Sequence, residues 1–179
     1  FDSPDQARKG LESIGARLVR ERTFEDNIVY DDDHGHLVRD GKLLRLRRWG
    51  DESTLTYKAK VAGEHRHKVR EEHETVVDRP DAVERMLAGL GFRPVYRYQK
   101  FRTMYGLPEL HACLDETPLG CFVELEGSPE AIDQAAERLG FCRDRYVLET
   151  YRELQERQAR ERGEEAGDLV FDEPGGDHR

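Results

Sequence analysis

Polar and apolar residues alternate along much of the chain with a period of two, which is typical of β-strands with one buried face. In the run LLRLRRW at residues 43–49, Leu44 and Leu46 fall on one face and Arg45 and Arg47 on the other. Alternation of this kind, bounded by turn residues, predicts seven strands. They are expected at residues 17–30, 43–49, 53–60, 67–77, 92–105, 109–116 and 121–127. Most connections between them are short, so neighbouring strands should be antiparallel.

A 13-residue motif occurs three times and predicts three helices with defined ends. The copies are SPDQARKGLESIG at 3–15, RPDAVERMLAGLG at 79–91 and SPEAIDQAAERLG at 128–140. Proline, an acid and a final glycine recur at positions that suit the first turn, the N-terminal end of the helix dipole and a left-handed C-terminal residue. Ser3 and Ser128 are good N-caps. Apolar residues at helical spacing predict a buried stripe on the first two helices, formed by Ala7, Leu11 and Ile14 and by Val83, Leu87 and Leu90.

Composition narrows the functional classes. At 179 residues the chain is long enough for one domain with a substantial core. Its net charge of −9 and pI near 5.3 argue against a general nucleic-acid binder, which is normally basic. Cys113, Cys121 and Cys142 lack Cys-x-x-Cys spacing, so neither a disulfide framework nor a zinc site is predicted, and reduced thiols of a cytoplasmic protein are expected. No apolar run reaches the ~18 residues that a membrane span needs.

The polar faces of the predicted strands carry like charges in pairs two residues apart, basic on some strands and acidic on others. For an isolated run of this kind, a face exposed to water is the ordinary explanation. Alternatively, the basic and acidic faces surround a shared interior. Arginine and lysine bind polyphosphate, and carboxylates bind Mg²⁺ or Mn²⁺ together with substrate phosphates. The second interpretation predicts a tunnel that holds a metal triphosphate. Tyr96 and Tyr98 share a face with Lys100, and would either line such a barrel or stack on a base.

Six short segments, LLRLR, TLTYK, REEHE, KFR, LDETPLG and VELEG, resemble in order and spacing those of the CYTH superfamily, which is named for class IV adenylate cyclases and thiamine triphosphatases. The resemblance covers residues 1–151 and is strongest to bacterial sequences described as class IV adenylate cyclases. It implies an α+β fold, an eight-stranded antiparallel β-barrel called the triphosphate tunnel, with helices packed outside. The family's first strand carries Glu-x-Glu-x-Lys, which is absent here, so this strand is expected upstream of Phe1. Residues 152–179 are expected to form a charged helix and a tail outside the CYTH domain.

The resemblance also implies roles for individual residues. The basic residues implied to bind the triphosphate are Arg45, Arg47, Lys58, Arg70, Lys100 and Arg102. The acidic residues implied to bind Mg²⁺ or Mn²⁺ are Glu72, Glu74, Asp115, Glu124 and Glu126. No residue is identified as catalytic.

The implied function is that of a metal-dependent enzyme acting on a small-molecule triphosphate, similar to class IV adenylate cyclases that convert ATP to cyclic AMP and pyrophosphate. An inorganic or organic (thiamine) triphosphatase is the alternative, and the sequence contains no residue that decides between the two. A non-catalytic polyphosphate-binding module is disfavoured, because an anion binder gains nothing from carboxylates facing its ligand. No nucleic-acid or membrane partner is expected, and the oligomeric state is left open, a dimer included.

Overall fold

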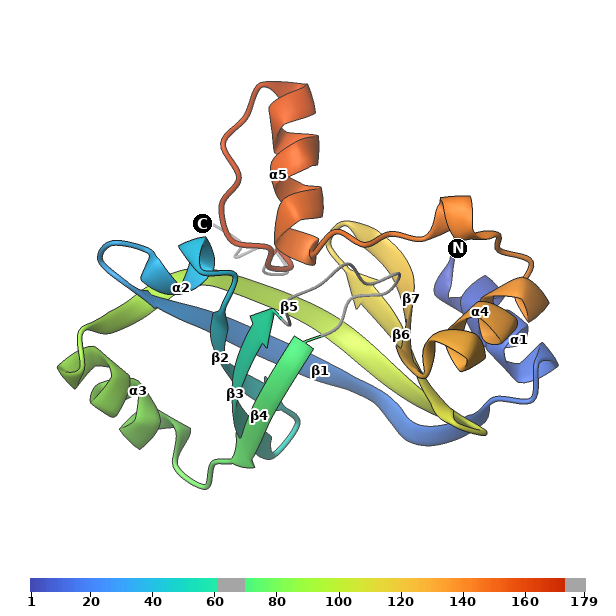
Figure 1. Cartoon of the computed structure of the whole chain (residues 1–179), viewed down its shortest axis with the longest axis horizontal. Helices are drawn as coiled ribbons and strands as arrows, with labels where there is room; N and C mark the ends of the chain where they lie inside the picture. Colours follow the sequence, from blue (N-terminus) through green and yellow to red (C-terminus); the bar gives the residue numbers. More distant parts are fainter. Residues whose placement is uncertain (61–69, 173–179) are drawn as a thin grey trace, which may run out of the picture.

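The computed structural model describes residues 1–60 and 70–172, with Arg70 described by its backbone alone. Its centre is one antiparallel sheet in the order β4-β3-β2-β1-β5-β6-β7. The strands are β1 Arg17–Asp32, β2 Leu43–Trp49, β3 Glu52–Lys60, β4 Arg70–Val76, β5 Phe92–Leu107, β6 Leu110–Thr117 and β7 Gly120–Gly127. Figure 1 shows the long strands β1 and β5 crossing the whole molecule, with β2–β4 toward one end and β6–β7 toward the other. The predicted α+β class, antiparallel pairing and seven strands are confirmed.

The sheet is not closed in the part of the chain that the structure describes. β4 and β7 are its two edges, and each pairs with a single neighbouring strand. The predicted barrel had eight strands, with the eighth expected upstream of Phe1. The eighth strand and the closure that it would provide therefore stay predictions.

The three repeated motifs form helices with the predicted ends. The helices are α1 Pro4–Ser13, α2 His36–Arg39, α3 Pro80–Gly89, α4 Pro129–Arg138 and α5 Tyr151–Arg162, with a short 3-10 helix at Arg143–Arg145. The side chains of Ser3 and Ser128 accept hydrogen bonds from backbone N–H groups of the first turn. Glycines 15, 91 and 140, at the ends of the three motifs, have φ of 84°, 86° and 83°, a left-handed conformation that glycine adopts without steric cost.

The outer, apolar face of the sheet is covered by α1, α3 and α4. Leu11 of α1 packs with Leu114 of β6, and Leu87 of α3 packs with Leu46 of β2. Burial of Ala7, Leu11 and Ile14 confirms the stripe predicted for α1. Leu90 was predicted to be buried and is 73% exposed, whereas Ile14, at the same C-cap position of α1, is buried in a cluster with Leu110 and Ala135. The opposite face of each strand is therefore directed away from these helices.

The C-terminal segment folds back onto the sheet after α5. The pairing of β6 with β5 begins at Phe101, so the N-terminal half of β5 has one edge without a sheet strand. Leu169 fills part of this edge: its N–H donates to the carbonyl of Arg97 at 2.9 Å, and its carbonyl accepts from the N–H of Gln99 at 2.8 Å. Leu154 of α5 and Leu169 are both buried. The charged helix predicted after residue 151 is thus present as α5, and the segment that follows it packs on β5.

No helix within residues 1–60 and 70–172 combines the length and the apolar composition that are needed to cross a membrane.

Candidate functional site

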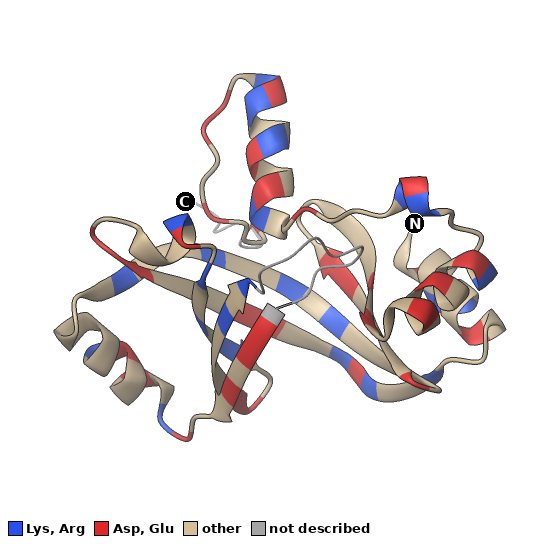
Figure 2. Ribbon diagram, viewed as in Figure 1, with Lys and Arg blue, Asp and Glu red and all other residues tan. Residues whose placement is uncertain are grey.

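Charged side chains from all seven strands lie on the inner face of the sheet, opposite the face covered by α1, α3 and α4. Leu46 packs against α3, so its neighbours Arg45 and Arg47 point to the other side of β2. Figure 2 shows basic positions along β5 and acidic positions along β4 and the β6–β7 pair. The inner face therefore has both signs of charge on adjacent strands, as the interior predicted from the sequence requires.

One half of the inner face is built by β2, β3 and β4. Arg47 donates from Nη2 to Glu74 Oε1 at 3.0 Å and from Nε to Thr54 Oγ1 at 3.2 Å. Lys58 Nζ donates to Glu72 Oε2 at 2.9 Å. The sheet register sets this pairing, since Lys58 lies directly opposite Glu72. The two glutamates have 34% and 43% of their side chains exposed, so these ion pairs border on solvent.

Arg45 lies deeper in the same half. Its guanidinium donates to Thr56 Oγ1 at 3.3 Å and to the Tyr98 hydroxyl at 3.1 Å. A Glu74 carboxylate oxygen lies 3.8 Å from Arg45 Nη2. The hydroxyl of Thr56 in turn donates to Glu74 at 2.7 Å. Arg45 thereby connects the β2–β4 half to the β5 strand that carries Tyr98.

The other half is centred on the buried carboxylate of Asp115 on β6. Arg102 of β5 donates to both of its oxygens, from Nε to Oδ1 at 2.7 Å and from Nη2 to Oδ2 at 2.6 Å. Lys100 Nζ and the Tyr151 hydroxyl each donate to Oδ2 at 2.8 Å. Arg102 Nη2 also contacts Glu124 on β7. Lys100 and Arg102 are thus held side by side, with 3% and 7% of their surfaces exposed.

Glu25 of β1 lies beneath these two cations, and the sequence analysis did not identify it. Glu25 is fully buried. Lys100 Nζ lies 3.6 Å from Glu25 Oε1, and Arg102 Nε lies 3.9 Å from Glu25 Oε2. Asn27 donates to Oε1 at 2.9 Å, whereas Oε2 has no hydrogen-bond partner among the described residues. The signal for Glu25 was present, because Glu25 and Asn27 stand two apart like the other inner pairs. Asp26, on the outer face between them, masks the alternation.

Each buried charge of the cluster is stabilised by neighbouring charges of opposite sign. Burial acts to raise the pKa of Glu25 and of Asp115, but the fields of Lys100 and Arg102 outweigh it and hold both pKa values below their ordinary range. Arg45 and Arg47 also lower the pKa of Glu25, so this carboxylate interacts with both halves of the site. Burial acts to lower the pKa of Lys100, and the fields of Glu124 and Asp115 more than compensate. Glu25, Asp115 and Lys100 are therefore ionised at neutral pH.

A buried ion cluster of this kind is poor evidence for a purely stabilising role. Apolar residues of similar volume are often as stable, because removing charges from water is costly. Strongly perturbed groups that converge on one face are more typical of a functional site.

Comparison with known proteins identifies the family. The sequence profile of the CYTH domain matches residues 2–159. The chain belongs to the CYTH domain family. A Methanocaldococcus jannaschii protein named "Putative adenylate cyclase" is 23% identical over 165 residues, which cover 86% of this chain and 93% of that protein.

Solved CYTH-like structures share the fold. One, described as "a putative adenylate cyclase" of Vibrio parahaemolyticus, has a TM-score of 0.72 and 20% identity, covering 86% of this chain and 92% of its own. HpAC1 of Hippeastrum, described as having a dominant triphosphatase activity, has a TM-score of 0.57 and 16% identity, covering 90% of each chain. At these identities the likeness shows the fold alone. The resemblance inferred from the sequence motifs is confirmed.

CYTH proteins are generally dependent on divalent metals, and the inner face tests whether this chain's residues suit one. Within residues 1–60 and 70–172, no cluster of three or more histidine, cysteine or acidic side chains forms a ready metal site. Both oxygens of Asp115 are already occupied by N–H and O–H donors. Glu124 has 37% of its side chain exposed, and Glu126 follows it on the same face of β7. Mg²⁺ commonly binds one or two carboxylates and completes its shell with phosphate oxygens, so this edge fits a metal that arrives with a phosphate ligand.

The structure brings most of the predicted site residues together. Arg45, Arg47, Lys58, Lys100 and Arg102 contact Glu72, Glu74, Asp115 and Glu124 through the ion pairs above. Glu126 is exposed and takes part in none of the ion pairs or hydrogen bonds found in the described ranges. The side chain of Arg70 lies outside the described residues. That these residues bind triphosphate and metal stays a prediction.

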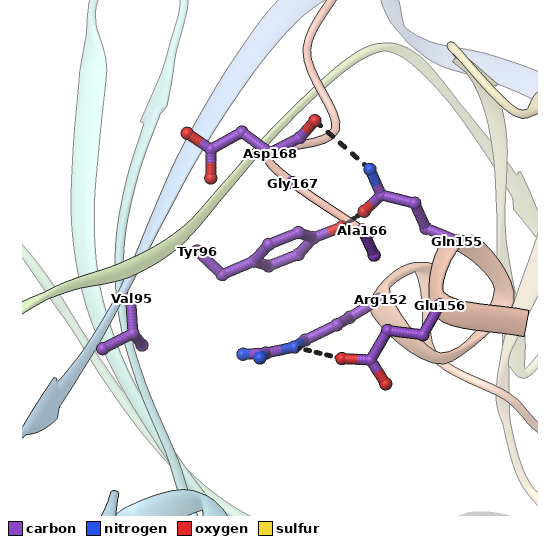
Figure 3. A pocket seen from close by; sticks show the side chains of 8 residues that line it. All are labelled: Val95, Tyr96, Arg152, Gln155, Glu156, Ala166, Gly167 and Asp168. Atoms are coloured by element: carbon purple, nitrogen blue, oxygen red, sulfur yellow. Dashed lines mark hydrogen bonds and ion pairs between the residues drawn. The ribbon is translucent and has the colours of Figure 1, made fainter. Parts of the chain in front are cut away.

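A cavity of about 340 Å³ lies beside the inner face, between β5, α5 and the returning C-terminal segment (Figure 3). The Tyr96 hydroxyl points toward α5 and donates to Gln155 Oε1 at 3.0 Å. The rings of Tyr96 and Tyr98 stack at 5.7 Å, and Arg152 lies 5.3 Å from the Tyr96 ring centroid. Tyr96 therefore lines this cavity, and Tyr98, stacked on it, contacts Arg45 of the cation cluster through its hydroxyl.

Proposed function

We propose that this CYTH protein is a divalent-metal-dependent enzyme that binds a nucleoside triphosphate on the inner face and forms cyclic AMP and pyrophosphate from ATP, as class IV adenylate cyclases do. The observation that carries the proposal is the pair of buried cations Lys100 and Arg102, held side by side by Asp115. Arg45 and Arg47 extend the row of cations across β2. Relatives from an archaeon and a bacterium, each described as a "putative adenylate cyclase", support the choice of reaction.

The inner cations have two different tasks in this proposal. Lys100 and Arg102 are fixed by Asp115 and present positive charge in one orientation, which costs no reorganisation when an anion arrives. Arg47 and Lys58 are paired with partly exposed glutamates, so they can exchange a carboxylate for a phosphate oxygen at the solvent border. Arginine grips phosphate at two points, whereas lysine acts as a point charge. A row of this kind suits a linear triphosphate better than a single phosphate group.

The residues that would hold the metal are Glu124 and Glu126, together with phosphate oxygens of the substrate. A bound Mg²⁺ or Mn²⁺ would supply neutralisation of charge that develops on the phosphoryl oxygens. Glu124 accepts from Arg102, which keeps its carboxylate next to the cation row.

In the cyclase reaction the 3′-hydroxyl of ATP attacks the α-phosphorus. The new bond joins O3′ to the α-phosphorus, the bond from the α-phosphorus to the bridging oxygen breaks, and pyrophosphate leaves with that oxygen. The hydroxyl proton is released to solvent or to a base. The positive residues of the chain stabilise the charge that builds up on the leaving pyrophosphate.

A triphosphatase is the second candidate, favoured by the activity reported for HpAC1 of Hippeastrum. Water would then attack the terminal phosphorus, and the products would be the diphosphate and inorganic phosphate. The same cations would serve, because the two reactions differ in the nucleophile and in the phosphorus that it attacks.

The experiment is a product analysis of the whole chain with ATP, thiamine triphosphate and tripolyphosphate, each with Mg²⁺ and with Mn²⁺. Cyclic AMP and pyrophosphate in equal amounts from ATP are expected, and Lys100→Met should abolish their formation. Arg48→Ala is the control, since Arg48 lies on the outer face of β2 and pairs with Glu84 of α3. Phosphate release without cyclic AMP would establish the triphosphatase instead. No turnover of any of the three would contradict both candidates.

A further inference from the structure

Tyr151, the first residue of α5, reaches from outside the sheet into the cation cluster. Its hydroxyl lies 2.8 Å from Asp115 Oδ2, and its ring centroid lies 5.3 Å from Lys100 Nζ. The ring of Phe122 packs edge-on against it at 5.3 Å. The sequence analysis placed residue 151 at the boundary of the domain and gave it no role.

Asp115 is the point on which the donors converge. Arg102 and Lys100, both from β5, supply three of the hydrogen bonds to its oxygens, and Tyr151 supplies the fourth from a different element. Burial and the fields of Glu124 and Asp115 raise the pKa of Tyr151 far above its ordinary value, so its hydroxyl stays protonated and remains a donor. A carboxylate with four donors has little freedom to rotate, and the cations that it anchors share that restriction.

The position of Tyr151 depends on how the C-terminal segment docks. Thr150 and Glu153 form a capping box that fixes the first turn of α5. Tyr96 of β5 holds the same helix by its hydroxyl bond to Gln155, and Gln155 donates to the carbonyl of Asp168 at 3.2 Å. Leu169 then joins the edge of β5. One connected set of contacts therefore runs from the returning segment to the hydroxyl on Asp115.

We propose that Tyr151 is a positioning residue of the triphosphate site: its hydroxyl fixes Asp115, and Asp115 holds Lys100 and Arg102 in the orientation that binds polyphosphate. The placement of Tyr151 at the capped start of α5 is then a condition for tight polyphosphate binding. The inference deepens the proposed function and rests on it. Tyr151 acts through Asp115 and contacts no substrate atom.

The test compares two variants that each remove one tyrosine hydroxyl from the contact between β5 and α5. Tyr151→Phe removes the hydroxyl on Asp115, and Tyr96→Phe removes the hydroxyl on Gln155 and leaves Asp115 untouched. The dissociation constant for tripolyphosphate is measured by calorimetry on the whole folded chain without metal. Tyr151→Phe should weaken binding about tenfold, the usual effect of losing a hydrogen bond to a charged group, and Tyr96→Phe should leave it close to wild type.

A second readout separates positioning from a general loss of structure. If Tyr151 acts through Asp115, Tyr151→Phe should have no further effect on tripolyphosphate affinity in an Asp115→Asn background. Equal losses in Tyr151→Phe and Tyr96→Phe, or additive losses in the double variant, would overturn the inference while leaving the proposed function intact. Should Asp115→Asn not fold, the comparison of the two tyrosine variants decides alone. A wild type that binds tripolyphosphate no better than monophosphate would overturn the proposed function, and the inference with it.

Discussion

Arg102 and Asp115 are joined by two hydrogen bonds inside the protein, with Nε 2.7 Å from Oδ1 and Nη2 2.6 Å from Oδ2. The geometry fixes the guanidinium plane relative to β6. Arg22 and Glu116 form the same two-point pair on the exposed outer face, with distances of 2.8 and 3.1 Å. The chain therefore contains a buried and an exposed example of one interaction.

The two pairs give a matched prediction. Arg102→Lys keeps the charge but loses the second contact, and should lower the free energy of unfolding by about 1–3 kcal/mol because an oxygen of the buried carboxylate loses its donor. It should also weaken tripolyphosphate binding. Arg22→Lys should change neither quantity appreciably, since exposed ion pairs contribute little. Urea unfolding measures the stability and calorimetry the binding. Equal destabilisation by both variants would contradict the expected difference between the buried and the exposed pair.

Glu25→Gln should destabilise the free protein and should increase the stabilisation that polyphosphate binding gives it. Removing the carboxylate leaves Lys100 and Arg102 with less compensation, and removing one partner of a buried ion pair costs on the order of 3 kcal/mol. A bound polyanion would restore the lost negative charge. Melting temperatures with and without tripolyphosphate should show a lower starting value and a larger rise than in wild type. Asp26→Asn, on the opposite face of β1, is the control, and a smaller rise in Glu25→Gln would contradict the prediction.

The depressed pKa values of Asp115 and Glu25 predict loss of stability in acid. Groups whose pKa is lower in the folded state stabilise it at neutral pH, and this stabilisation is lost as the pH falls from the ordinary carboxyl value of about 4 toward the folded-state pKa. The free energy of unfolding should therefore fall below about pH 4, and it should fall less steeply in Asp115→Asn. If the free energy of unfolding fell with equal slope in the wild type and in Asp115→Asn between pH 5 and pH 2, Asp115 would be excluded as a source of the effect.

Glu124→Gln should raise the metal concentration that half-maximal turnover needs. The substitution removes a partly exposed carboxylate that is suited to a divalent cation. Glu116→Gln removes a carboxylate on the outer face of β6 and should leave the metal dependence unchanged. Titration of Mg²⁺ at fixed substrate measures the effect, and an unchanged midpoint in Glu124→Gln would remove it from the metal site.

The sequence predicted the fold and the inner face because both follow from local patterns. Alternation along β2 separates Arg45 from Leu46, and capped motifs define α1, α3 and α4. Which charges pair with each other was harder to predict from the sequence, because the pairing depends on the register between strands that are distant along the chain. Lys58 meets Glu72 through the pairing of β3 with β4, and Asp115 meets Arg102 and Tyr151 through β5–β6 pairing and the docking of α5. The family resemblance implied that Asp115 binds a metal; in the structure its oxygens accept hydrogen bonds from protein donors, and metal binding by Asp115 stays a prediction.

Glu25 and Tyr151 were missed for different reasons. Glu25 lies among acidic residues on both faces of β1, so its alternation is blurred. Tyr151 belongs to a helix whose other residues are mostly charged, and only the fold shows that its first residue enters the interior.

The most direct measurement of the central claim is the melting temperature of the metal-free chain with tripolyphosphate and with monophosphate at matched ionic strength. A site filled to about 100 times its dissociation constant gains about 2.7 kcal/mol, which is readily detected by thermal melting. Tripolyphosphate should raise the melting temperature well above monophosphate, Arg47→Ala should remove most of the difference, and Arg48→Ala, on the outer face of the same strand, should retain it. Equal protection by the two anions, or an undiminished difference in Arg47→Ala, would contradict the account of the inner face as a triphosphate site.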